Sequence, residues 1–171
     1  MKPILTITKN DICEYDLLFY RPSSFFGLAI KIFDSLRYGR FDIAFSHVAI
    51  VLRDEEGNLR RYDAMEGYRT GFRESFDNCY VFSLPLSDKE KIGIKKHCLS
   101  RKWSKYDMRG IFSFFTSINE DEFRDYCSEL IKNALLKTVY WNILGKEEKI
   151  SPLRLWILLR KYTTFKGLFL G

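Results

Sequence analysis

Residues 44–66 carry the pattern that restricts the fold most. Residues 44–53 are mostly apolar and β-forming, and residues 59–66 can form a second strand. Residues 54–58 between them read DEEGN, which is a charged and turn-forming sequence. Two such segments joined by a short turn predict a β-hairpin, and a hairpin implies an antiparallel sheet.

Further strands and several helices are predicted around this hairpin. Strands are expected over residues 16–21 and 79–84, each stopped by the proline that follows it. Helices are expected over residues 25–36, 87–102, 109–115 and 125–140, and from Ser151 onward. Antiparallel strands with segregated helices indicate the α+β class.

Two of these helices have clear start signals. Ser87 is followed three residues later by Glu90, which together form a capping box. Ser151 is followed by Pro152, a serine cap with proline at the first helical position.

The chain has the size and composition of one domain. Its 171 residues are 46% hydrophobic and 29% charged, without a repeat or a linker, so we expect a single domain over 1–171. No apolar run approaches the roughly 18 residues of a membrane span, and the first residues do not form a signal peptide. We therefore expect a cytoplasmic protein.

The four cysteines are widely scattered and lack the spacing of a zinc site. Cys13, Cys79, Cys98 and Cys127 include no CxxC pair, so we expect reduced thiols and neither a metal nor an organic cofactor. His97 adjoins Cys98, but neighbouring helical side chains diverge by about 100°, so these two cannot form a dyad.

The register of the hairpin decides which side chains meet across it. With an even-length loop, position i pairs with 113 − i, which places His47 opposite Glu66 and Val51 opposite Tyr62. Directly opposed side chains share a face of the sheet within hydrogen-bonding reach. Asp63 is the competitor of Glu66, but this register places Asp63 on the face opposite to His47. An odd-length loop would shift the pairing by one residue.

Cys127 lies at the start of the helix predicted over residues 125–140. It precedes Leu130 and Ile131 by three and four residues, so it falls on the buried stripe of that helix. The first turn of a helix favours a thiolate through its backbone N–H groups and the helix dipole. A nucleophile needs a base and an orienting group beside it. His47 and Glu66 supply both if the helix packs on their face, and the Cys127 amide is a candidate oxyanion donor.

Two pairs of segments resemble a known family. The segments SHVAIV (46–51) and DAMEG (63–67) are similar to the first half of a circularly permuted NlpC-type papain-like domain. Tyr106-Asp107 and YCSELI (126–131) resemble its second half. This branch includes YiiX-like bacterial proteins, poxvirus relatives and the lecithin retinol acyltransferase group, and it places His before Cys. The chain differs from the last group because Leu59 and Arg60 stand where that group has a second His.

The resemblance implies a papain-like fold and a cysteine hydrolase or acyltransferase. It implies Cys127 as nucleophile, His47 as base and Glu66 as the polar third residue. The substrate would contain an amide or ester bond, with N-acylated and peptidoglycan-like compounds as candidates. Tyr20, Tyr106 and Tyr126 are candidate substrate-binding residues, although aromatic side chains of the core have the same pattern.

The excess positive charge is confined to the C-terminal part of the chain. The net charge is +6, and residues 132–171 hold 8 Lys and Arg against 2 Glu, whereas the rest is balanced. This segment is either a solvated helix face or a site that attracts an anionic membrane, a phosphate backbone or a cell-wall polymer. We expect no nucleic acid partner. Two alternatives to an enzyme remain. One is a protein that binds a ligand in the same cleft without catalysis, and the other is a membrane or nucleic-acid binding protein that acts through the basic C-terminal segment.

Overall fold

The computed structural model describes residues 5–22, 25–39, 45–64, 70–74, 76, 78–106 and 124–170. The main strands are β1 (Thr6–Ile7), β2 (Leu17–Tyr20), β3 (His47–Arg53), β4 (Leu59–Asp63), β5 (Gly71–Arg73), β6 (Cys79–Ser83) and β9 (Thr164–Phe169). They form one sheet in the order β1-β9-β6-β2-β3-β4-β5. Its neighbouring strands are antiparallel, except that β1 is parallel to β9.

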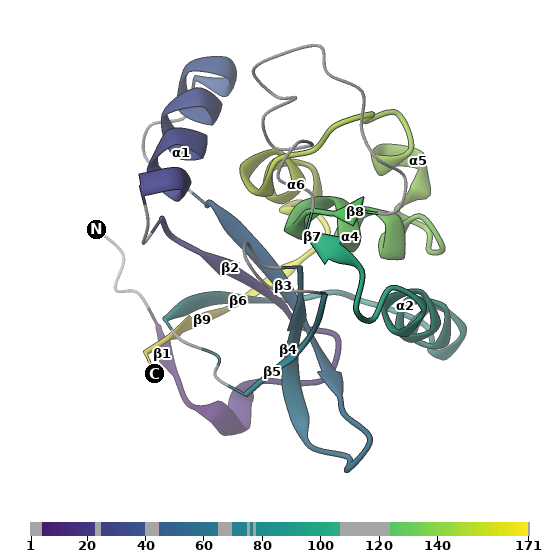
Figure 1. Ribbon diagram of the computed structural model, residues 1–171. Coiled ribbons are helices and arrows are strands. Elements are labelled where there is room, and N and C mark those ends of the chain that lie inside the picture. Colours follow the sequence, from purple (N-terminus) through teal and green to yellow (C-terminus); the bar gives the residue numbers. More distant parts are fainter. Residues whose placement is uncertain are drawn as a thin grey trace.

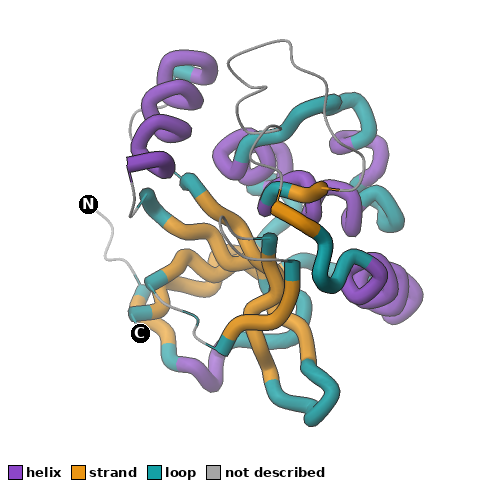
Figure 2. Tube along the Cα trace, in the orientation of Figure 1, coloured by secondary structure: helices purple, strands orange, loops and turns teal. Residues whose placement is uncertain are grey.

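The helices lie mainly on one side of this sheet. They are α1 (Phe25–Tyr38), α2 (Asp88–Ser100), α4 (Cys127–Leu135), α5 (Trp141–Leu144) and α6 (Pro152–Leu159), with a 3-10 turn, η1, at Lys9–Asp11. Two short strands, β7 (Lys105–Tyr106) and β8 (Arg124–Asp125), form a separate parallel pair. Figure 1 and Figure 2 show α2, α4, α5 and α6 beside the sheet, while α1 stands at its periphery. The predicted α+β class is confirmed.

The predicted hairpin is present, but the predicted register was wrong by one residue. Ile50 lies opposite Tyr62, and Val51 lies opposite Arg61 rather than Tyr62. The turn over residues 54–58 has an odd length, and Gly57 takes a left-handed conformation there with φ 85°. A shift of one residue turns every side chain of a strand to the other face of the sheet.

The two faces of β3 contribute to two separate hydrophobic clusters. Val48 and Ile50 pack with residues of α2, α4 and α6 in the main core. Ala49 and Val51 point the other way, into a smaller cluster under the N-terminal segment, which includes Ile12. Residues on opposite faces of β3 therefore serve different parts of the molecule.

Both predicted helix caps are present. The Ser87 side chain accepts from the backbone of Glu90, and the Glu90 carboxylate accepts from the backbone of Ser87 at 2.8 Å. The Ser151 hydroxyl accepts from the backbone of Arg154, with Pro152 in the first turn of α6. The helix predicted over residues 125–140 is shorter than expected, because α4 ends at Leu135 and α5 follows separately. The helix predicted over residues 109–115 lies outside the described residues.

The basic C-terminal segment is built into the fold to a greater extent than its sequence predicts. Strand β9 lies inside the sheet, between β1 and β6. The Lys166 ammonium contacts the Asp16 carboxylate at 2.8 Å, and Arg154 pairs with Glu147 at 2.6 Å. Lys132 donates to the backbone carbonyls of Glu147 and Glu148. Several of its cations therefore stabilise the protein itself. No helix among the described residues is long and apolar enough to cross a membrane.

Substitution of two glycines should change stability in opposite directions. A Cβ at Gly167 would lie 2.6 Å from the Leu5 carbonyl oxygen and 2.5 Å from Ile7, so Gly167→Ala should separate β1 from β9. We expect a loss of about 1–3 kcal/mol in the free energy of unfolding. Gly93→Ala in α2 meets only ordinary contacts and should gain about 0.5–1 kcal/mol. Urea denaturation followed by circular dichroism measures both, and equal stability of the two variants would contradict the predicted packing.

Candidate active site

Cys127 is the first residue of α4 and lies against the sheet. Tyr126 is the N-cap, and the helix packs on β3, where Cys127 joins the main hydrophobic core. Two contacts fix this end of the helix to the segment before α6. The Ser128 hydroxyl donates to the Ile150 carbonyl at 2.6 Å, and the Tyr126 hydroxyl accepts from the Ile150 amide at 3.3 Å. A thiol at a buried helix N-terminus is in the setting that activates catalytic cysteines.

His47 is the first residue of β3 and contacts the Cys127 side chain. Its imidazole hydrogen-bonds the thiol and also lies 2.9 Å from Asp63, from His47 Nε2 to Asp63 Oδ2. Because Nε2 is used by the carboxylate, Nδ1 is the ring nitrogen that serves the thiol. Tyr20 lies directly opposite His47 on β2, with the ring centres 5.4 Å apart. The imidazole is thus held from three sides.

Asp63 is the carboxylate that orients His47 in the structure. Tyr62, its neighbour on β4, points into the main core, so Asp63 points to the other face of the sheet together with Ala49 and His47. The side chain of Asp63 is completely buried. The predicted register put Asp63 on the wrong face, and the preference for Glu66 rested on that register. Glu66 itself lies outside the described residues.

Two arginines on the same face of the sheet compensate the charge of Asp63. Arg61 Nε lies 3.0 Å from Asp63 Oδ2, and Arg73 Nε lies 3.6 Å from Asp63 Oδ1. Arg61 and Arg73 are paired across β4 and β5, and the guanidinium of Arg61 also lies 5.3 Å from the centre of the Tyr20 ring. Neither arginine was predicted from the sequence. Arg61 lies two residues before Asp63 on β4 and so shares its face, whereas Arg73 reaches this face only through the pairing of β5 with β4.

These contacts shift the protonation of both Asp63 and His47. Burial by itself raises the pKa of Asp63, but the hydrogen bond and charge of His47 and the charges of Arg61 and Arg73 lower it. Burial by itself lowers the pKa of His47, but the Cys127 thiolate and the Asp63 carboxylate raise it to about 10. The ring is therefore a cation at neutral pH when the thiolate faces it. A thiolate, an imidazolium and a carboxylate in a row suit nucleophilic attack on a carbonyl carbon.

The three candidate substrate-binding tyrosines have different surroundings. Tyr20 is buried beside His47, and its hydroxyl donates to the Phe76 carbonyl at 2.7 Å. Tyr126 is buried and supports the start of α4 through Ile150. Tyr106 belongs to β7, but its side chain lies outside the described residues. Tyr20 and Tyr126 thus have clear structural contacts, and substrate binding by the three stays a prediction.

The other thiols lie away from the His47 ring. Cys98 is buried in the main core, and Cys79 is buried in the cluster on the opposite face of the sheet. Cys13 is exposed near the N-terminus, with its Sγ 3.8 Å from the Asp11 carbonyl oxygen. His97 is half-buried on α2, next to Cys98 in sequence but on a different side of the helix.

The comparisons with known proteins agree with this architecture. No protein-family model matches the chain, and no curated protein sequence matches it. Among solved structures, it is similar to the crystal structure of the metalloprotein YiiX from Escherichia coli O157:H7, with a TM-score of 0.64. The chain has a YiiX-like fold. The match covers 92% of this chain and 98% of that chain at 15% sequence identity, so the likeness is one of fold.

A YiiX-like fold was expected from the sequence, and this expectation is confirmed. YiiX is described as a metalloprotein. In the described part of this chain, no group of three or more His, Cys, Asp or Glu side chains is arranged to hold a metal ion. The described residues therefore do not fit a resident metal.

Selective alkylation tests whether Cys127 is activated. Iodoacetamide near pH 6 should modify Cys127 before Cys13, although Cys13 is exposed and Cys127 is buried, because an imidazolium and a helix N-terminus favour the reactive thiolate. His47→Ala should slow the labelling of Cys127 and leave Cys13 unchanged. Peptide mass spectrometry measures the rate at each cysteine. Faster labelling of Cys13 than of Cys127 would show that exposure alone governs reactivity.

The pH dependence of this labelling tests the role of Arg61. In Arg61→Met, loss of the guanidinium charge raises the pKa of Asp63. Asp63 is then protonated at a higher pH, and once protonated it no longer stabilises the imidazolium of His47. We expect the acid limb of the Cys127 labelling profile to move upward by about one pH unit. Arg60→Met is the matched control, because Arg60 pairs with Asp54 at 3.0 Å in the turn of the hairpin. An unshifted profile in Arg61→Met would rule out this electrostatic role.

Proposed function

We propose that this protein is a cysteine-nucleophile acyl hydrolase or acyltransferase that acts on amide or ester bonds. The observation that carries the proposal is the His47 ring, which hydrogen-bonds the Cys127 thiol on one side and the buried Asp63 carboxylate on the other. Nucleophile, base and orienting group in this order form the arrangement of a catalytic triad. In this proposal Asp63 takes the role that the sequence assigned to Glu66.

The first half of the reaction forms an acyl-enzyme. The Cys127 thiolate attacks the carbonyl carbon, a sulfur–carbon bond forms, and the carbonyl electrons move to the oxygen. Backbone N–H groups in the first turn of α4, including that of Cys127, are the candidate donors to this oxyanion. The His47 imidazolium then gives its proton to the leaving nitrogen or oxygen as the bond to carbon breaks.

The second half releases the acyl group. Neutral His47 takes a proton from water, or from another acceptor, as that molecule attacks the thioester. The Cys127 sulfur then leaves as a thiolate beside the imidazolium, so the starting state is restored. Asp63 remains ionised throughout and stabilises the charge that forms on the ring. Water as acceptor gives a hydrolase, and an amine or alcohol gives a transferase.

The substrate class proposed here is a peptide or acyl conjugate, with N-acylated and peptidoglycan-like compounds as the first to test. A thiolate beside an imidazolium suits attack on the carbonyl carbon of an amide or ester. Detection of an acyl-enzyme by intact-protein mass spectrometry, with panels of N-acyl peptides and acyl esters, identifies the bond type. A chain that binds these compounds without any covalent adduct would be a ligand-binding protein instead.

Substitutions in the triad should have a non-additive pattern. Cys127→Ala and His47→Ala should each abolish hydrolysis of any reporter that the unmodified protein accepts, and the double variant should be little worse, because the two residues act as a unit. Asp63→Asn should lower the rate by about a hundredfold or more, and Glu66→Gln by much less. Initial rates measure these effects.

The matched control is Cys98→Ala, which removes a buried thiol of the main core on α2 rather than the one at the start of α4. Activity should persist in Cys98→Ala, and the melting temperature of Cys127→Ala should change little. If Cys127→Ala kept its activity and lost several degrees, Cys127 would be a packing residue. If Glu66→Gln cost more than Asp63→Asn, the assignment of the third residue would be reversed while the dyad would stand.

A further inference from the structure

We infer that α1 docks this protein on an anionic membrane surface through an apolar ridge formed by Leu28, Ile32 and Leu36. These three side chains are 45%, 53% and 70% exposed. They are spaced four residues apart, so they lie along one side of the helix. The inference stands on these observations and does not depend on the proposed reaction.

The described side chains of α1 include buried polar residues and exposed apolar residues. Asp34 and Ser35 are turned inward and are 1% and 2% exposed, while the apolar ridge is turned outward. A surface helix in water buries its apolar stripe and exposes its polar side chains. Burial of Asp34, which hydrogen-bonds the Ser151 side chain, adds a desolvation cost to this arrangement. An apolar medium beside the outer face of α1 accounts for the exposed apolar ridge and for the inward position of Asp34 and Ser35.

The charges around the ridge fit an anionic lipid surface. At about 100° per residue, Lys31 falls on one side of the ridge and Arg37 on the other. The only carboxylate of α1 is Asp34, which is buried, so α1 presents no acidic side chain beside the ridge. An apolar strip flanked by long cationic side chains is the pattern of a helix that lies in the membrane interface.

The size of the ridge favours a membrane over a protein partner. A stable protein–protein interface uses roughly 20–30 residues on each side. The three side chains of the ridge, on a helix at the periphery of the molecule (Figure 1), fall well short of that number. Insertion into lipid needs no complementary partner surface, and its strength scales with buried apolar area and anionic charge.

The position of α1 connects membrane docking to the candidate site. The helix joins β2 to β3, and the strand ends that flank this connection are Tyr20 and His47, which are paired. Docking through α1 would therefore place the His47 end of the sheet near the lipid surface. A substrate that resides in or on the membrane would reach the site from there.

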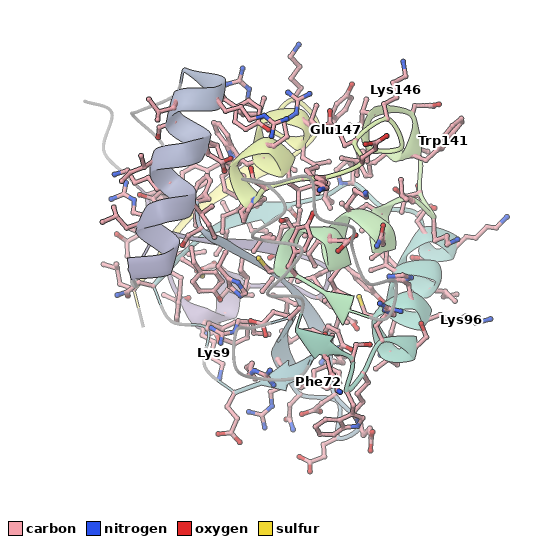
Figure 3. All side chains as sticks on the ribbon, turned by 45° about the horizontal axis from the view of Figure 1, so that its top comes forward. Lys9, Phe72, Lys96, Trp141, Lys146 and Glu147 are labelled. Carbon is pink, nitrogen blue, oxygen red and sulfur yellow. The ribbon has the colours of Figure 1, made fainter. Side chains whose placement is uncertain are left out.

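Vesicle flotation tests this inference. The full chain should bind phosphatidylcholine vesicles that contain phosphatidylserine, bind pure phosphatidylcholine less, and dissociate as salt is raised. The triple variant Leu28→Gln, Ile32→Gln, Leu36→Gln should lose about tenfold or more in partition coefficient. The matched control is Ile92→Gln, Val139→Gln, Trp141→Gln, which removes equally exposed apolar residues. Trp141 projects from the side of the molecule opposite to α1 (Figure 3), and this control should bind normally.

A second variant keeps the test decisive if the triple variant unfolds. The Ile32→Trp fluorescence should shift to the blue with anionic vesicles and be quenched by brominated lipids, as expected for insertion to about 5–10 Å. No shift, equal binding by the triple variant, or loss of binding in the control triple would overturn the inference. A dimer that only the α1 triple converts to monomer, without vesicle binding, would assign the ridge to a second copy instead. Cys127→Ala should bind as tightly as the unmodified chain, which separates docking from the proposed catalysis.

Discussion

The buried carboxylate of Asp63 is the group on which the candidate site depends. An ionised side chain without water needs charged or hydrogen-bonding partners, because its desolvation cost is several kcal/mol. Asp63 has three: His47 at 2.9 Å, Arg61 at 3.0 Å and Arg73 at 3.6 Å. They come from three adjacent strands, so the pairing of β3, β4 and β5 assembles the site. The same carboxylate, together with the Cys127 thiolate, raises the pKa of the His47 imidazole.

The three residues of the candidate triad come together where the two faces of the sheet meet. Cys127 approaches with α4 from the face that carries the main core, whereas His47 and Asp63 project from the opposite face. Contact is possible because His47 is the first residue of β3, at the end of the strand. The Cys127 thiol is buried, and the His47 ring that contacts it belongs to a polar cluster of Tyr20, His47, Arg61, Asp63 and Arg73.

The sequence by itself predicted the central hairpin, several of the helices and the pair of residues, His47 and Cys127, that the structure brings into contact. The turn residues at 54–58, the capping box at Ser87 and the Ser151-Pro152 start act through nearby backbone, so their effects follow from spacing. The resemblance around His47 and Cys127 gave the YiiX-like fold. Short-range patterns did not give β9, because a basic segment with few alternating apolar residues becomes a strand only when β1 and β6 pair with it.

Only the tertiary structure decided which carboxylate faces His47. The sequence allowed Glu66 or Asp63, and the choice depended on whether the turn holds an even or an odd number of residues. The hydrogen bonds between β3 and β4 set a register in which the turn has an odd length. This register brings Asp63 to the same face of the sheet as His47. Arg61 and Arg73 gained their roles in the same step, since charges distant in sequence stabilise one another only after strand pairing brings them within a few ångströms. Local sequence patterns thus predicted most of the helices and strands, whereas the register of the sheet decided which charged side chains lie beside His47.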